Sequence, residues 1–293
     1  MVDSPPKIVP LAAVLHEDLV QVPLPLRAAP HGFRTLFPDL LAGETDAQVE
    51  ALWTYLAAGS SAQFPKGLII NRSDFDLAPT AEEPTLVGVF MKGLSGRVLA
   101  VGYPDRVNVA YDMENVRLGR AWRGDFINVK GTWVARAGSL ESPAGTDVID
   151  FAPGLPVAII SQRDAPWPDA PVRDQGWRFG GYRRDEARRP VFRITGPGGV
   201  EVTESVVPML AADGVHLVRT FRFEGDSVPR NLTMRFARSS RIYPTGDDAW
   251  RTEEGLIIAV RGAPAAVVEV AGAMELRAPV TRAGTEVEVE VRW

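Results

Sequence analysis

Residues 286–293 read EVEVEVRW, and this stretch decides the fold class. Its apolar members are Val287, Val289, Val291 and Trp293, and its polar members are Glu286, Glu288, Glu290 and Arg292. Successive side chains of a β-strand point to opposite faces of the sheet, so strict alternation predicts a strand with one buried and one solvated face.

The same two-residue period extends upstream as far as Leu68, interrupted by Gly, Pro and Asp. The predicted strands are 68–71, 86–92, 97–103, 107–111, 116–122, 125–129, 132–136, 147–151, 156–160, 177–184, 190–195, 200–206, 215–223, 231–237, 256–261, 266–270 and 273–277. Many short strands with turn signals between them predict a mainly β fold of antiparallel sandwiches. The proline-rich break DAPWPDAPVRD (164–174) predicts two β-rich units, 67–163 and 164–293.

One short capped helix is predicted over residues 45–58. Thr45 and Gln48 have the spacing of a capping box. The apolar stripe consists of Val49, Leu52, Trp53 and Leu56. With the turn that follows it, this helix forms a predicted segment at 45–66.

The first 44 residues form a predicted proline-rich arm. Proline fixes φ and lacks an amide donor, so long helices and central strands are disfavoured there. The arm carries apolar residues, Leu11, Leu15 and Leu19 among them, that need cover. They pack either on the arm's own domain or on a partner, and the three leucines are candidate docking residues.

Composition excludes several classes of function. The formal net charge of −5 argues against a general nucleic-acid binder. The absence of cysteine excludes disulfides, thiolate chemistry and covalent haem attachment. No apolar run approaches the ~20 residues of a membrane-spanning helix, so the chain is not expected to be transmembrane. No signal peptide is visible, so either the protein is not exported by the route that such a peptide serves or residue 1 is not the original start.

The sequence contains no catalytic or metal motif, and we predict a protein that is not an enzyme and has no cofactor. The three histidines, His16, His31 and His216, lie far apart in sequence. Carboxylates near aromatic residues or following a GPGG turn leave a carbohydrate-binding or carbohydrate-active β-sandwich as the alternative. These carboxylates are Asp112, Glu114, Asp125, Glu201 and Glu204.

The densest charge run is WRFGGYRRDEARRPVFR (177–193), which is predicted to form a hairpin. Its candidate docking residues are Arg178, Arg183, Arg184, Arg188 and Arg189. Either the hairpin is solvated and pairs its own charges, or it docks on an acidic partner or on anionic lipid headgroups. Among the tryptophans, Trp167 in the proline-rich break is predicted to be the most exposed and is a candidate interface anchor.

Residues 31–59, HGFRTLFPDLLAGETDAQVEALWTYLAAG, resemble the closing segment of a class I cytochrome c domain. Residues 90–138 resemble the β-rich region that follows such a domain in multidomain cytochrome-bearing proteins of planctomycete-type bacteria. The resemblance rests on spaced residues such as VGYP (101–104), AWRGDF (121–126) and GTW (131–133). There is no C-x-x-C-H motif, and residues 31–45 lack the axial methionine. The resemblance therefore implies a scaffold that has lost its haem.

The resemblance and the arginine-rich hairpin together predict a non-catalytic, membrane-extrinsic structural subunit. Its partners are expected to be subunits of an electron-transfer complex of respiratory or photosynthetic type. The expected location is periplasmic and peripheral to the membrane.

Overall fold

The computed structural model describes residues 46–47, 75–133, 140–225 and 227–293. Within these ranges the chain is mainly β, and its larger sheets are antiparallel, as the sequence predicts. The chain divides into two compact units, Met1–Leu77 with Asn128–Ser139 and Ala78–Ile127 with Leu140–Trp293. The predicted arm and most of the predicted helix lie outside the described residues, apart from Asp46 and Ala47, which are helical.

The described part of the first unit is small. Strands β1 (Asp76–Leu77) and β6 (Ile127–Asn128) form a two-stranded sheet, followed by α5 (Lys130–Trp133). The predicted strand at 132–136 is wrong over its described residues, because Lys130–Trp133 is helical. The Asn128 side chain accepts a hydrogen bond from the Lys130 amide at 3.1 Å, as an N-cap residue does, and this starts the helix.

The second unit contains a five-stranded sheet in the order β2-β3-β4-β5-β7. Its strands are β2 (Thr85–Val89), β3 (Val98–Gly102), β4 (Val107–Asp112), β5 (Arg117–Arg123) and β7 (Thr146–Asp150). All residues of β3 and β4 are buried, so these two central strands are covered on both faces.

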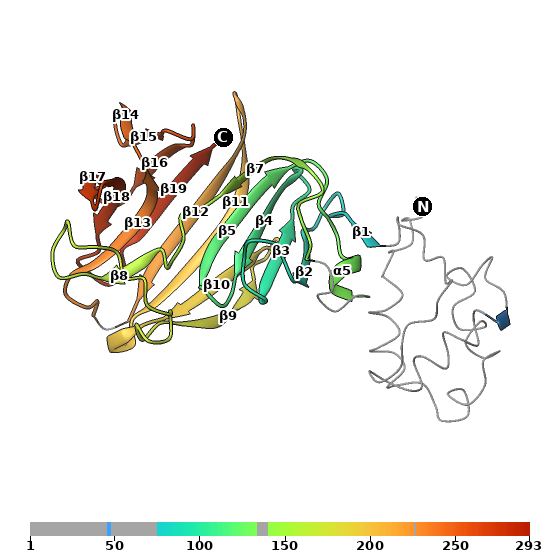
Figure 1. Cartoon of the computed structure of the whole chain (residues 1–293), viewed down its shortest axis with the longest axis horizontal. Coiled ribbons are helices and arrows are strands. Elements are labelled where there is room, and N and C mark those ends of the chain that lie inside the picture. Colours follow the sequence, from blue (N-terminus) through green and yellow to red (C-terminus); the bar gives the residue numbers. More distant parts are fainter. Residues whose placement is uncertain (1–45, 48–74, 134–139, 226) are drawn as a thin grey trace. The chain divides into compact units, whose positions relative to one another are not determined.

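An eight-stranded sheet forms the largest layer of this unit, in the order β14-β15-β16-β19-β12-β11-β10-β9 (Figure 1). Its strands are β9 (Arg178–Arg184), β10 (Pro190–Thr195), β11 (Glu201–Ala211), β12 (Gly214–Glu224), β14 (Ile242–Gly246), β15 (Ala249–Thr252), β16 (Ile257–Arg261) and β19 (Glu286–Arg292). The alternating stretch that opened the sequence analysis is β19, which pairs with β12 on one side and β16 on the other. Its three valines are at most 1% exposed, which confirms the predicted buried face.

A four-stranded sheet in the order β17-β18-β13-β8 completes the unit. Its strands are β8 (Val157–Ile159), β13 (Leu232–Ser239), β17 (Ala266–Val270) and β18 (Ala273–Pro279). Strand β8 precedes the predicted boundary at residue 163 and pairs with β13 beyond it. The two predicted β-rich segments therefore share a sheet.

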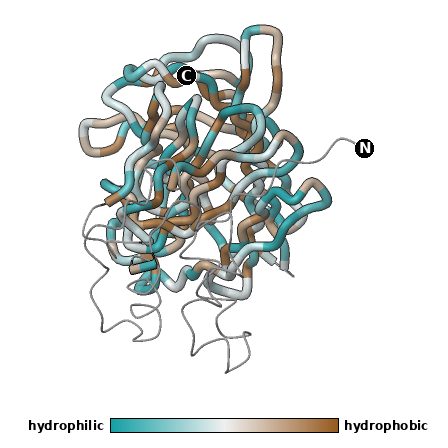
Figure 2. Tube along the Cα trace, turned by 90° about the vertical axis from the view of Figure 1, so that its right-hand side faces the viewer, coloured by the Kyte–Doolittle hydropathy of each residue, from teal (hydrophilic) through white to brown (hydrophobic). Residues whose placement is uncertain are grey.

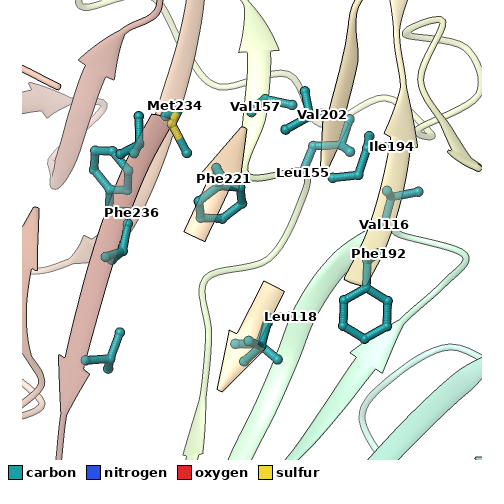
Figure 3. Close-up of a cluster of buried hydrophobic side chains, with 14 of the residues drawn as sticks. Val116, Leu118, Leu155, Val157, Phe192, Ile194, Val202, Phe221, Met234 and Phe236 are labelled. Atoms are coloured by element: carbon teal, nitrogen blue, oxygen red, sulfur yellow. The ribbon is translucent and has the colours of Figure 1, made fainter. Parts of the chain in front are cut away.

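The three sheets also share one hydrophobic core. Figure 3 shows apolar side chains from the five-, four- and eight-stranded sheets meeting in it, among them Leu118, Met234 and Phe221. The Tyr111 ring of β4 stacks on Phe192 of β10 with centroids 3.8 Å apart. Along the strands, apolar residues recur between hydrophilic ones (Figure 2), which is the periodicity that predicts the fold.

Candidate functional site

The arginine-rich segment forms the predicted hairpin of β9 and β10. The β9 strand is the edge of the eight-stranded sheet, with Phe179 and Tyr182 on the side of Ile194 and Phe192. Between them the register shifts, and Gly180 and Gly181 lie opposite a single residue, Arg193. Gly181 has a φ of 96°, which favours glycine. A bulge of this kind twists an edge strand away from pairing, so the edge presents side chains more than backbone.

Arg183 and Arg184 are the exposed cations at the hairpin end of this edge strand, and Arg178 is exposed at its start. Arg183 pairs in register with Val191 and Arg184 with Pro190, so their side chains lie on opposite faces of the sheet. Neither side chain forms an ion pair or a hydrogen bond with any residue that the structure describes. The neighbouring Tyr182 is 42% exposed, and arginine with tyrosine is the composition typical of interface hot spots.

The two arginines at the turn of the hairpin, Arg188 and Arg189, have carboxylate neighbours. Arg189 Nε donates to Asp185 Oδ2 at 2.9 Å across the turn. Arg188 Nε lies 3.8 Å from Glu83 Oε2. The structure thus combines features of both interpretations of this segment, because Arg189 pairs within the turn and Arg188 with Glu83, whereas Arg183 and Arg184 have no ion pair among the described residues.

Arg178, at the start of β9, lines a groove of about 880 Å³. Two further arginines line it, Arg97 and Arg173, which the sequence analysis did not single out. Arg97 and Arg173 lie 76 positions apart in the sequence. Only the fold brings them together, and no local sequence signal could have found them.

Trp167 does not lie on the arginine-rich hairpin. Its indole Nε1 donates to the Leu155 carbonyl at 3.1 Å, and its side chain is half-buried. The ring covers two guanidinium groups, with Arg235 Cζ 4.7 Å and Arg277 Cζ 5.2 Å from its centroid. The tryptophan that was predicted to be exposed therefore closes an internal charge cluster.

That cluster is a buried Arg–Glu–Arg arrangement on β13 and β18. Arg235 Nη1 lies 3.1 Å and Arg277 Nη2 2.5 Å from the two oxygens of Glu275, whose side chain is 3% exposed. Arg277 Nη1 also donates to the carbonyls of Arg163 and Ala165, at 2.9 and 2.8 Å. Most contacts of the cluster are therefore structural, although Arg277 also lines a pocket of about 550 Å³.

The carboxylates that motivated the carbohydrate alternative are also engaged. Asp125 pairs with Arg106 at 2.9 Å, and Glu201 lies 3.5 Å from Arg193. Asp112 is fully buried and accepts from Ser95 Oγ at 2.5 Å and from Asn115 Nδ2 at 2.8 Å. These contacts hold turns and surface pairs together. Of the five carboxylates, Glu114 alone forms no side-chain hydrogen bond or ion pair within the described ranges.

The fifth carboxylate, Glu204, lies inside the core. Arg219 Nη2 is 2.7 Å from its Oε1, and the two side chains are 6% and 0% exposed. Burial raises the pKa of Glu204, while Arg219 acts in the opposite direction. The Tyr111 hydroxyl lies nearby, and burial together with the negative charge of Glu204 raises the pKa of that phenol. Buried away from a cleft, this pair is a structural element of the core.

His216 lies between two carboxylates on the outer face of the eight-stranded sheet. Its Nδ1 is 2.6 Å from Glu290 Oε1 and its Nε2 is 2.8 Å from Asp213 Oδ1. Arg292 lies 3.5 Å from Asp213 and 3.7 Å from Glu290, so a cation also faces both carboxylates. Across the described ranges, no group of three or more His, Asp or Glu side chains could hold a metal ion.

Comparisons with protein-family models, with curated proteins and with solved structures each found no match. Among the described residues, no helix is long and apolar enough to cross a membrane. Leu11, Leu15 and Leu19 lie outside the described residues. The candidate site is therefore the arginine-bearing edge of β9 and the groove at its start.

Proposed function

We propose that this chain is a non-catalytic docking subunit that binds an acidic partner protein through the exposed edge of β9. The observation that carries the proposal is the pair Arg183 and Arg184, exposed beside Tyr182 and without an ion pair among the described residues. Charged groups arranged in this way steer encounter with a partner of opposite charge and fix its register.

The identity of the partner comes from the sequence resemblance. A β-rich region that follows a haem domain, in a chain without the haem motif, favours a structural subunit of an electron-transfer complex. We place it on the periplasmic face, peripheral to the membrane, with a respiratory or photosynthetic complex as the partner. The arm over 1–44 supplies a second contact in this proposal.

The test is association with the native complex. Arg183→Glu/Arg184→Glu changes the charge by −4 on the edge strand, and Arg251→Glu/Arg282→Glu changes it equally at two exposed arginines elsewhere. We expect the first double variant to lose the complex during gentle detergent extraction and size-exclusion chromatography, and the second to retain it. Equal retention of both variants would refute the docking edge.

A second experiment, with lipid vesicles, distinguishes an acidic protein partner from anionic lipid headgroups. Wild-type protein is sedimented with vesicles of neutral lipid and with vesicles that contain phosphatidylserine. We expect no binding to either at physiological salt. Binding to the anionic vesicles that Arg183→Glu/Arg184→Glu abolishes would assign the edge to headgroups and overturn the protein partner.

A further inference from the structure

We infer that the groove at the start of β9 binds a short acidic peptide segment in which carboxylate and apolar side chains alternate. The inference deepens the proposed function and rests on it, because it names what the acidic partner presents. Three guanidinium groups line this groove of about 880 Å³, those of Arg97, Arg173 and Arg178. All three residues are exposed, and none forms a side-chain hydrogen bond or ion pair with a residue in the described ranges.

One wall of the groove is held rigidly by a buried carboxylate. Asp112 accepts hydrogen bonds from the amide and hydroxyl of Ser95 and from the amide and side chain of Asn115. It therefore ties the turn that precedes Arg97 to the turn over residues 113–116. Val116 in that second turn has a φ of 51° and is 1% exposed, so core burial holds a backbone conformation that valine otherwise avoids.

Another part of the lining is a compact turn that begins at Pro171. Its carbonyl accepts from the amides of Asp174 at 2.9 Å and Gln175 at 3.3 Å, and the Val172 carbonyl accepts from the Trp177 amide at 3.1 Å. Trp177 is 1% exposed and anchors the turn in the core. Arg173 therefore lies on a fixed turn. Because this turn is already ordered, less conformational entropy is lost when a ligand binds to the groove.

The chemistry of the lining selects the ligand. Guanidinium forks match carboxylate or phosphate oxygens in bidentate geometry. Glu114 and Asp174 also line the groove and interrupt its positive charge, which suits spaced carboxylates better than a dense polyanion such as nucleic acid. Half-buried Met113 and Phe179 supply apolar surface between the charges. Spaced carboxylates with apolar residues between them satisfy all three features.

The experiment uses the full chain and a fluorescein-labelled heptapeptide of alternating glutamate and leucine. A second peptide carries glutamine in place of every glutamate. By fluorescence anisotropy, we expect saturable binding of the first peptide and at least tenfold weaker binding of the second. Equal affinity for the two peptides would overturn the inference, as would no binding of either.

Variants separate the groove from the edge of β9. Arg97→Glu/Arg173→Glu touches only the groove, and we expect at least tenfold weaker binding with an unchanged melting temperature, since both side chains are exposed and unpaired. The charge-matched Arg251→Glu/Arg282→Glu is expected to stay within twofold of wild type. Equal losses in the two variants would make the effect one of net charge and refute the groove.

Two further results distinguish a failure of the groove assignment from a failure of the proposed docking function. Arg183→Glu/Arg184→Glu is expected to weaken the peptide by less than threefold, while it releases the native complex. Release of the complex without any peptide binding would end the groove assignment and leave the docking edge intact. If inorganic phosphate displaces the peptide where chloride of equal ionic strength does not, the groove is a phosphate site and the peptide assignment falls.

Discussion

Arg219 Nη2 lies 2.7 Å from Glu204 Oε1 within the core, with neither side chain more than 6% exposed. In the β11–β12 register Arg219 is opposite Val206 and Glu204 is opposite Phe221, so the pair is a diagonal contact on the core face of the eight-stranded sheet. A buried pair of this kind adds little net stability, but breaking it leaves an uncompensated charge in an apolar environment.

Replacing one partner of this pair is therefore expected to destabilise the fold strongly. Glu204→Gln should lower the free energy of unfolding by about 3–5 kcal/mol, measured by urea denaturation. Glu286→Gln breaks the exposed pair of Arg222 and Glu286, which lie 2.6 Å apart, and should cost at most about 1 kcal/mol. Similar losses in the two variants would contradict the burial of the first pair.

Because two tyrosines are buried, we expect the fold to lose stability at alkaline pH. Burial raises the pKa of Tyr103 and of Tyr111 above the ordinary value of 10.0. The folded chain keeps both phenols protonated while the unfolded chain ionises them, so the stability they contribute is complete below pH 10 and declines above it. Each should contribute a slope of up to about 1.4 kcal/mol per pH unit there.

The measurement compares urea unfolding between pH 9 and 11 in wild type and in Tyr103→Phe. The variant loses the hydrogen bond from the Tyr103 hydroxyl to the Val206 carbonyl, so it should be less stable at pH 9. Its stability should then fall less steeply, and the difference from wild type should shrink as the pH rises. Parallel pH profiles would show that Tyr103 is not a source of the slope.

Trp167 is expected to protect the Arg235–Glu275–Arg277 cluster. Trp167→Ala removes a ring that covers both guanidinium groups and should destabilise the fold by about 2–4 kcal/mol. Trp167→Phe keeps an aromatic face but loses the hydrogen bond to the Leu155 carbonyl, and should cost about 1 kcal/mol. Thermal unfolding of both variants checks the order, and an equal melting temperature for Trp167→Ala and wild type would rule the covering role out.

Two glycines in paired strands make a matched test of packing. A Cβ at Gly102 would lie 2.7 Å from the Phe126 ring, whereas one at Gly88 would have nothing within 4 Å. Gly102→Ala should lower the free energy of unfolding by about 1–3 kcal/mol, and Gly88→Ala should change it by less than about 1 kcal/mol. Denaturation curves that rank them in the opposite order would contradict this arrangement of the core.

Most of the fold is predictable because many strands bury one face and so alternate in sequence, whereas β3 and β4, buried on both faces, are predictable as short apolar segments between turn residues. The alternating valines of 286–293 identify β19, and the segments 107–111 and 190–195 agree closely with β4 and β10. Strands β14 and β15 were not predicted, because the turn-forming stretch PTGDD (244–248) falls within their hairpin and many of its residues are exposed. The strand predicted at 132–136 is a helix over its described residues, 132–133, because the Asn128 cap begins α5.

The candidate site could be predicted only in part, because charge pairing depends on long-range geometry. The run 177–193 identified the hairpin, yet only the fold shows that Arg189 is paired with Asp185 while Arg183 and Arg184 are not. The groove joins residues from three separate segments, so its arginines carry no common sequence signal. Trp167 was predicted from its prolines to be exposed, and it instead lies over two arginines that follow it by more than 60 positions.

The most direct test of the docking account is the size of the native assembly that contains this chain. Tagged wild type, Arg183→Glu/Arg184→Glu and Arg251→Glu/Arg282→Glu are expressed in place of the native protein, extracted gently and compared by size-exclusion chromatography. The account predicts that wild type and the second variant elute in a large complex while the first elutes near the 31.8 kDa of the free chain. Elution of the first variant in the complex, or of wild type as the free chain, would contradict it.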